Sequence, residues 1–225
     1  TDLPLALERL RWLPHDLGSR RVFINQPEFM VRYYEQDDVK LSMRVVVGKK
    51  SNQTSFFYDE IERVEFNPYW GVPRSIIVNE MLPRLVNDPG YLDRAGYEVT
   101  DSKGRRIPSS AIDWGAHGAN IPYNVRQTPG EANALGELKI MFPNEFSVYL
   151  HGTPDDELFA RQQRAFSSGC IRLEEPAKMA EWLLGADGED KVSTLTTALA
   201  GDETTRINLS APTRVHITYM TATVD

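Results

Sequence analysis

The sequence predicts a mainly β fold with short helices, an α+β class. Runs rich in Val, Ile, Phe and Tyr recur between turn signals in both halves of the chain. Apolar residues at helical spacing fill only short segments. The 225 residues are 41% hydrophobic and 25% charged, which is the balance of a globular chain. This length suits one sizeable domain or two small ones.

The first third of the chain predicts one helix followed by strands. Residues 5–13 space four leucines among charges and predict a short helix that Pro14 ends. Residues 22–25, 29–35 and 39–48 are β-rich, with a turn at 35–38, and predict a hairpin or small meander. Residues 61–66 predict another strand, which Asn67 and Pro68 stop. We assign residues 1–21 to an N-terminal helical linker and residues 22–225 to the main domain.

Residues 68–124 differ from the rest by their many Pro and Gly residues. Within them, residues 73–88 predict a helix and a following turn. Because the segment separates two β-rich halves, we expect a small subdomain inserted in the sheet. Its aromatic residues suit a lid over a site, and they equally suit a core of its own.

The second half predicts strands and three helices. Residues 135–144 and 146–153 predict two strands joined at Pro143 and Asn144. Helices are expected over residues 155–166, 174–185 and 189–202, the second with Pro in its first turn and Gly185 at its end. Two further strands are expected over residues 205–224.

Charge and hydropathy argue against several function classes. The net charge of −7 disfavours general nucleic-acid binding, which needs clustered Lys and Arg. No apolar run approaches the roughly 18 residues of a membrane span, and the first residues show no signal-peptide pattern. The single cysteine cannot form an internal disulfide, so the cysteine count does not reveal the redox compartment.

That cysteine, Cys170, lies in "AFSSGCIRL" and permits two interpretations. A lone cysteine is more often buried and inert than reactive. However, Gly169 allows close approach of a ligand, and backbone N–H groups near the following helix can form an oxyanion hole. His151, in "VYLHGTP", ends an apolar run and is the candidate base that activates the thiol. A structural role for His151 stays open, and His117 is a weaker rival.

These residues resemble the active-site signature of the L,D-transpeptidases. In that signature, a histidine and any one residue are followed by a spacer. The spacer is followed by Ser or Thr, then His, Gly and Cys. The matching positions here, around the fourteen residues 153–166, are His151, Gly152, Ser167, Gly169 and Cys170. Ser168 stands where many members have a histidine that is usually not the base. The segments "FNPYWGVPRSI" and "ALGELKIMFPNEFSVYLHGTP" are also similar to the family, most of all to its large periplasmic Gram-negative members.

The resemblance implies a β-sandwich catalytic domain with a capping subdomain, here about residues 68–124, as the catalytic part of a longer periplasmic protein. It implies that Cys170 attacks the bond between diaminopimelate and the terminal D-Ala of a tetrapeptide stem. D-Ala leaves, and the acyl group passes to a diaminopimelate amine of a second stem, forming a 3-3 cross-link. The implied partners are peptidoglycan stem peptides, with carbapenems as covalent inhibitors and no nucleic acid.

The resemblance also implies residue roles. His151 takes the thiol proton, and the carbonyl of Gly152 orients the imidazole. The backbone N–H groups of Ser168, Gly169 and Cys170 form the oxyanion hole. Four side chains are expected to contact substrate, namely Tyr149, Ser167, Arg172 and Trp70; for Arg172 we favour bracing of the loop, and for Tyr149 a packing role stays open. Tyr69 is a further candidate in the cap. No cofactor and no metal are expected, because one His and one Cys fall short of a zinc set.

Three alternative functions stay open: two keep the cysteine chemistry with another acceptor or partner, and one has no catalysis. If water takes the acyl group, the protein is an L,D-carboxypeptidase. If the partner is an outer-membrane lipoprotein, it is an anchoring or detaching enzyme. A non-catalytic cell-wall binding module is the alternative from another class. A papain-like protease is disfavoured, because its Cys precedes its His in the chain.

Overall fold

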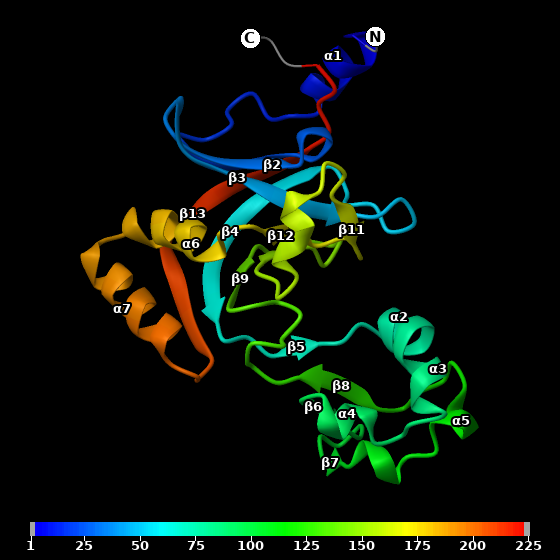
Figure 1. Cartoon of the computed structure of the whole chain (residues 1–225). Helices are drawn as coiled ribbons and strands as arrows, with labels where there is room; N and C mark the ends of the chain where they lie inside the picture. Colours follow the sequence, from blue (N-terminus) through cyan, green and yellow to red (C-terminus); the bar gives the residue numbers. More distant parts are fainter. Residues whose placement is uncertain (1–2, 223–225) are drawn as a thin grey trace.

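The computed structural model describes residues 3–222. Within this range the main sheet has nine strands in the order β11-β3-β12-β10-β9-β4-β13-β1-β2, and β2 also pairs with β3 (Figure 1). Its strands are β1 (Arg20–Asn25), β2 (Met30–Glu35), β3 (Asp38–Gly48), β4 (Phe57–Phe66), β9 (Leu138–Met141), β10 (Leu150–His151), β11 (Ala165–Ser167), β12 (Ile171–Leu173) and β13 (Thr205–Thr218). The pairing of β2 with β3 closes the sheet on itself around one core.

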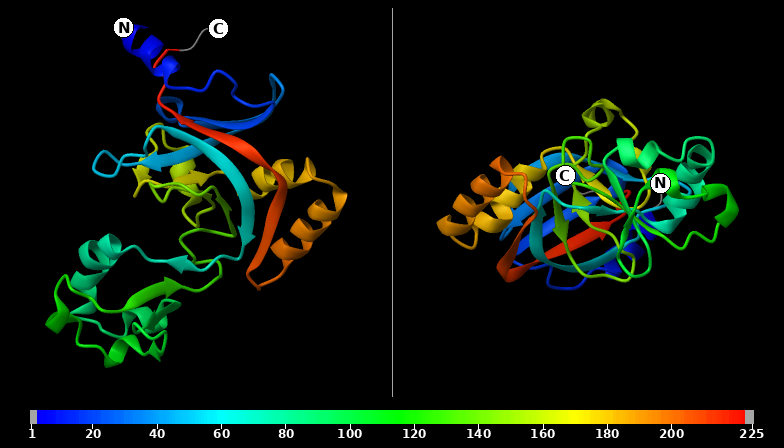
Figure 2. Two further views of the ribbon diagram at one scale, coloured as in Figure 1. Left: turned by 180° about the vertical axis from the view of Figure 1, so that it is seen from behind. Right: turned by 90° about the horizontal axis from the view of Figure 1, so that it is seen from below.

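Two helices cover one side of this sheet, as Figure 2 shows. They are α6 (Pro176–Gly185) and α7 (Glu189–Ala200). Met179 and Leu183 of α6 and Leu195 of α7 are buried in the same apolar cluster as the strand residues. A further helix, α1 (Leu3–Arg11), lies beside the described C-terminal residues at the far end of the molecule. No helix within residues 3–222 is both long enough and apolar enough to cross a membrane.

A second sheet, in the order β5-β8-β6-β7, forms a separate layer at the opposite end from α1 (Figures 1 and 2). The strands of this sheet are β5 (Trp70–Gly71), β6 (Tyr97–Thr100), β7 (Arg106–Ile107) and β8 (Asn124–Gln127). The helical segments between them are α2 (Arg74–Ile76), η2 (Ile77–Met81), α3 (Leu82–Leu85), α4 (Tyr91–Arg94), η3 (Ser109–Ala111) and α5 (Trp114–His117). Leu85, Leu92 and Trp114 are buried in a core that is distinct from that of the main sheet. We call this part, residues 70–127, the cap.

The mainly β fold class is confirmed, and most expected elements are present. Helices lie within the expected ranges at 74–85, 176–185 and 189–200, and the first helix, expected over 5–13, covers 3–11. In the cap, the helix widens into a π-turn, η2, just before Pro83, whose missing N–H breaks the regular hydrogen-bond pattern. The main sheet begins at Arg20, so the last two residues of the expected linker belong to β1.

Two expected elements before the cysteine are wrong in extent. Of the strand expected over residues 146–153, only β10 is regular, because the Asn144 side chain donates to the carbonyls of Phe142 and Val148 and accepts from the N–H groups of Phe146 and Val148. Of the helix expected over residues 155–166, only the 3₁₀ turn η4 (Asp156–Ala160) forms. The following residues join β3 as β11, an edge strand.

The two strands expected over residues 205–224 are one strand, β13, up to Thr218; residues 223–224 lie outside the described range. β13 pairs with β4 on both sides of a register shift between Asn208 and Thr213. Pro212 lies in this gap and has no N–H to donate, so it interrupts the ladder without ending the strand.

Candidate active site

Cys170 and His151 come from neighbouring strands of the main sheet. β10 pairs in parallel with β12, with Leu150 opposite Ile171 and His151 opposite Arg172. Cys170 directly precedes β12, and the N–H of Ile171 donates to the carbonyl of Tyr149 at 3.2 Å. The spacer 153–166 therefore forms a loop that returns the chain to the strand beside the histidine. The register therefore places Cys170 opposite Tyr149, two residues before His151 on the neighbouring strand.

His151 is buried, with 4% of its surface exposed. Its Nδ1 donates to the Gly152 carbonyl at 2.5 Å, which leaves the Nε2 lone pair free to accept a proton. Burial lowers the pKa of His151 to about 3; the Gly152 carbonyl opposes this shift and the charge of Arg172 adds to it. The imidazole is therefore neutral at neutral pH, with its Nε2 unprotonated.

The backbone of Gly152, whose carbonyl orients the imidazole, packs closely against a second glycine, Gly136. A Cβ at Gly136 would lie 2.6 Å from the backbone N of Thr153 and 2.8 Å from the carbonyl carbon of Gly152, and Gly136 has a φ of +64°. Any side chain at position 136 would push this segment away. Sequence reasoning missed Gly136, and no local signal marks it.

The Cys170 thiol is half-buried, and its recorded contact is with the carbonyl of Ser147, with the Sγ and O atoms 3.7 Å apart. Burial raises the pKa of Cys170, against the lowering effects of the neighbouring Tyr149 and of the Arg172 charge. Within residues 3–222 no hydrogen bond joins Cys170 to His151. The resting pair is thus a neutral thiol beside a neutral imidazole.

The turn before Cys170 is built around the Ser167 hydroxyl. This buried hydroxyl donates to the Cys170 carbonyl at 2.5 Å and accepts from the N–H of Gly169 at 3.1 Å. Gly169 has a φ of +123°, which side chains disfavour. The Ser167 hydroxyl is thereby engaged within the loop, and so is the Gly169 N–H, an expected oxyanion donor. In the described chain, the N–H groups of Ser168 and Cys170 have no recorded partner.

Thr54 ties the turn to the loop that follows β3, and sequence reasoning missed it too. Its Oγ1 donates to the carbonyl of Gly169 at 2.8 Å and accepts from the N–H of Gly48 at 2.9 Å. The N–H of Lys49 also donates to the Ser167 carbonyl at 3.0 Å. These bonds fix the turn on its outer side.

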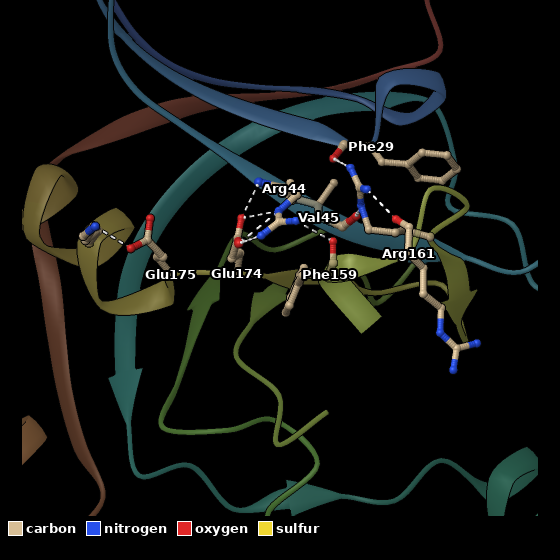
Figure 3. A network of polar contacts seen from close by, with 9 residues as sticks. Phe29, Arg44, Val45, Phe159, Arg161, Glu174 and Glu175 are labelled. Atoms are coloured by element: carbon tan, nitrogen blue, oxygen red, sulfur yellow. Dashed lines mark hydrogen bonds and ion pairs between the residues drawn. The ribbon is translucent and has the colours of Figure 1, made fainter. Parts of the chain in front are cut away.

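Two arginines fix the chain on either side of the turn at residues 167–170 (Figure 3). Arg44 on β3 pairs with Glu174, directly after β12, and Arg44 Nη1 donates to the Phe159 carbonyl at 2.9 Å. The hydrogen bond from Arg44 holds the pKa of Glu174 below its usual range. The buried Arg164 donates at 2.7–3.2 Å to three backbone carbonyls, those of Phe29, Val45 and Arg161. This arrangement pins the chain before β11 and after β12 to β3.

Tyr149 and Trp70 place the cap against the candidate nucleophile. The Tyr149 ring lies beside the His151 ring, with centroids 5.6 Å apart. Burial and the neighbouring Cys170 raise the pKa of Tyr149, while the nearby Trp70 lowers it. Tyr149 thus lies beside His151 and opposite Cys170 across the pair of β10 and β12. Tyr69 lies apart from this contact, stacked against Arg126 of the cap.

Arg172 contacts the loop after the histidine rather than open solvent. Its Nη1 donates to Asp155 Oδ2 at 2.8 Å and to Thr153 Oγ1 at 3.3 Å. Both partners are side chains of the loop between His151 and Cys170, and the role of Arg172 toward a substrate stays a prediction. His117 lies in α5 of the cap, edge-on to Tyr123. Among residues 3–222, no three His, Cys, Asp or Glu side chains are arranged to hold a metal ion.

Comparison with known proteins relates the chain to one family. The YkuD model, which describes the L,D-transpeptidase catalytic domain, matches residues 19–217. A Haemophilus influenzae protein with the curated name "Putative L,D-transpeptidase" is 34% identical over 223 residues, which cover 99% of this chain and 45% of that protein. The chain thus spans less than half the length of this relative.

Similar solved structures include L,D-transpeptidase 3 from Mycobacterium tuberculosis, at 10% identity and a TM-score of 0.42, covering 89% of this chain and 61% of that one. An L,D-transpeptidase from Mycobacterium smegmatis has 10% identity and a TM-score of 0.39, covering 89% and 58%.

Proposed function

Because the chain belongs to the family of L,D-transpeptidase catalytic domains, we propose that it is a peptidoglycan L,D-transpeptidase with Cys170 as its nucleophile. The observation that carries this proposal is the strand pairing that sets Cys170 beside Tyr149 and His151 beside Arg172. It brings a lone thiol and an oriented, neutral imidazole to one site, which is the arrangement that thiol acylation needs.

In the first half of the reaction, the thiol sulfur attacks the carbonyl between diaminopimelate and D-Ala of a tetrapeptide stem. His151 Nε2 takes the thiol proton as the S–C bond forms, so no free thiolate is required beforehand. The N–H groups of Ser168 and Cys170 stabilise the oxyanion, and the loss of one such donor costs about 3 kcal/mol in the barrier. The imidazolium then protonates the amine of D-Ala, the C–N bond breaks, and a thioester remains.

In the second half, the side-chain amine of a diaminopimelate on another stem attacks the thioester. His151 takes a proton from the attacking amine, the C–S bond breaks, and the proton returns to the sulfur. The product is a 3-3 cross-link with the enzyme regenerated. We place this reaction in the periplasm of a Gram-negative bacterium, in keeping with the Ser-Ser-Gly-Cys form of the turn.

The test is mass spectrometry of muropeptides after incubation with tetrapeptide donors, with wild type and Cys170→Ala side by side. The proposal expects dimers joined through two third-position residues, from wild type only. Tripeptides without dimers would make the protein an L,D-carboxypeptidase instead. Transfer only to a lysine of an outer-membrane lipoprotein would make it an anchoring enzyme.

A carbapenem separates catalysis from a non-catalytic cell-wall binding module. A relative, L,D-transpeptidase 3 from Mycobacterium tuberculosis, has been solved in complex with a faropenem-derived adduct. For this chain we expect one carbapenem adduct by intact mass in wild type and none in Cys170→Ala. An unmodified wild-type protein with its cysteine reduced would favour the binding module.

A further inference from the structure

The turn at residues 167–170 presents two backbone N–H groups, those of Ser168 and Cys170, that have no recorded partner within residues 3–222. The N–H between them, that of Gly169, is taken by the Ser167 hydroxyl at 3.1 Å. In the reaction proposed above, the two free N–H groups bind the oxyanion. Such donors act only when they are held toward the oxygen on which charge develops. The direction of each N–H is therefore part of the catalytic apparatus.

The peptide unit that contains the Ser168 N–H is held from outside the turn. A trans peptide unit is planar, so its N–H and its C=O point in opposite directions. The carbonyl of this unit belongs to Ser167, and it accepts from the N–H of Lys49 at 3.0 Å. The Ser168 N–H therefore points away from Lys49.

The peptide unit that contains the Cys170 N–H is held in the same way, but by a side chain. Its carbonyl belongs to Gly169 and accepts from Thr54 Oγ1 at 2.8 Å. The N–H of Gly48 donates to the same Oγ1 at 2.9 Å, which leaves the single hydroxyl proton for the Gly169 carbonyl. Only 6% of Thr54 is exposed, so water has little access to compete for this bond. The Cys170 N–H therefore points away from Thr54.

The loop at residues 49–54, which supplies both holding groups, is itself packed against the end of β3. A Cβ at Gly48 would lie 2.2 Å from the carbonyl oxygen of Asn52 and 2.6 Å from the backbone N of Thr54, so a glycine is needed for this close approach. The N–H of Asn52 donates to the carbonyl of Lys49 at 2.8 Å. The strands on either side of the turn, β11 and β12, also pair with β3. One strand thus supports both the turn and the loop that orients its peptide units.

From these contacts we propose that Thr54 is a positioning residue for the oxyanion hole, because it holds the peptide unit of Gly169 and Cys170 with the Cys170 N–H toward the substrate carbonyl. This inference rests on the proposed function and adds to it a residue that lies 116 positions before the nucleophile. Without the hydroxyl, the Gly169 carbonyl loses its partner and the peptide unit is free to turn. Because the negative charge on oxygen develops only in the transition state, the loss is expected in kcat rather than in KM.

The test compares two reactions of the same cysteine. Acylation of Cys170 by a carbapenem passes through an oxyanion, whereas iodoacetamide is displaced at a saturated carbon and forms none. In Thr54→Val, where a methyl group replaces the hydroxyl, we expect the acylation rate to fall about tenfold or more. The iodoacetamide rate should stay at the wild-type value, which a displaced thiol would not allow. Both rates are measured by intact mass.

Two further variants separate positioning from general stability. Thr54→Ser, which keeps the hydroxyl, should restore most of the acylation rate. Thr218→Val is the matched control, because the Thr218 hydroxyl is also buried and donates to a backbone carbonyl, that of Ile24, at 2.8 Å. Thr218 lies where β13 pairs with β1, so its loss should lower the melting temperature without slowing acylation. Thr54→Ala, with a smaller side chain, replaces Thr54→Val in the comparison if the valine variant does not fold.

The proposal is wrong if Thr54→Val is acylated at the wild-type rate, if acylation and alkylation fall together, or if Thr54→Ser is as slow as Thr54→Val. Steady-state kinetics with tetrapeptide donors separate this inference from the proposed function. The expected acylation pattern without any cross-linked product would overturn only the proposed function. Cross-linking with wild-type kcat in Thr54→Val would overturn only the role of Thr54.

Discussion

His151 and Cys170 are both held in their uncharged forms. Burial lowers the pKa of the imidazole and raises that of the thiol, so the two shifts together oppose a resting thiolate–imidazolium pair. The proton is therefore expected to move only when a substrate carbonyl reaches the sulfur. Arg172 partly opposes the raised pKa of Cys170, because its positive charge favours the thiolate. The guanidinium is at the same time bonded to Asp155.

This assignment predicts the pH dependence of thiol alkylation. Because Cys170 is the single cysteine, the iodoacetamide reaction of the native protein reports on it alone. A thiol deprotonates as pH rises, and its raised pKa places that change above neutrality. We expect the rate to rise about tenfold per pH unit from about pH 5 to 8 without a plateau. Protonation of His151, with a pKa of about 3, falls below this window.

The rate of alkylation by iodoacetamide is measured across this pH range by stopped flow or mass spectrometry, with Cys170→Ala as the blank. A plateau below pH 7 would show a stabilised thiolate and contradict the neutral pair.

At the scale of elements, β10 and β12 are short and depend on what surrounds them. β10 has two residues and β12 three, so their own ladder bonds are few. Arg44, Arg164 and Thr54 add side-chain bonds to backbone carbonyls or to Glu174 around this pair. The close approach of Gly136 to Gly152 supports the carbonyl that orients His151.

Gly136→Ala tests that close approach, with Gly104→Ala as the matched control. Both glycines have positive φ, +64° and +77°, but a Cβ at Gly104 meets nothing within 4 Å. Both variants carry the strain of about 1 kcal/mol that a left-handed alanine costs. Only Gly136→Ala should also displace Gly152, lowering kcat about tenfold or more and destabilising the fold by about 2–4 kcal/mol in total. Equal kcat in the two variants would show that Gly152 does not depend on this packing.

The sequence was most informative where structure depends on neighbours along the chain. The strands at 29–35, 39–48 and 61–66 and the helices at 174–185 and 189–202 follow local patterns and are present. The expected helix over 155–166 failed because the edge of β3, far away in the chain, takes residues 165–167 as a strand. The strand expected at 146–153 failed because one side chain, Asn144, satisfies the backbone groups around it.

The same distinction applies to the site. The spacing of His151 and Cys170 could be read from the sequence, because one loop joins two adjacent strands. Thr54, Gly136 and Arg44 approach the site from other parts of the chain, and a threonine, a glycine or an arginine in isolation carries no signal of such a contact. Ser168 is exposed at the turn, and that it leaves the base unchanged stays a prediction.

At the scale of the whole molecule, the main sheet and the cap have separate apolar cores. Trp70 of the cap lies near enough to Tyr149 to lower the pKa of that residue, and Tyr149 lies beside His151. The rest of the cap folds around Leu92 and Trp114.

Because the main sheet and the cap have separate apolar cores, we expect each part to unfold with its own stability. Leu92→Ala, at a fully buried cap position, should cost about 2–5 kcal/mol. We expect faster amide hydrogen exchange across residues 70–127, with protection of the main sheet retained. Leu184→Ala, equally buried in α6, is the counterpart and should loosen the main sheet. An equal rise in exchange in both parts for both variants would show one cooperative unit.

The central claim is that Cys170 carries the acyl group between donor and acceptor. Its most direct test is intact-mass measurement during incubation with a tetrapeptide donor and no acceptor, followed by peptide mapping. The account predicts an adduct equal to the donor less D-Ala, located on Cys170, which disappears as cross-linked dimer forms when a diaminopimelate-containing stem is added. Dimers formed without any adduct on Cys170, or by Cys170→Ala protein, would contradict it.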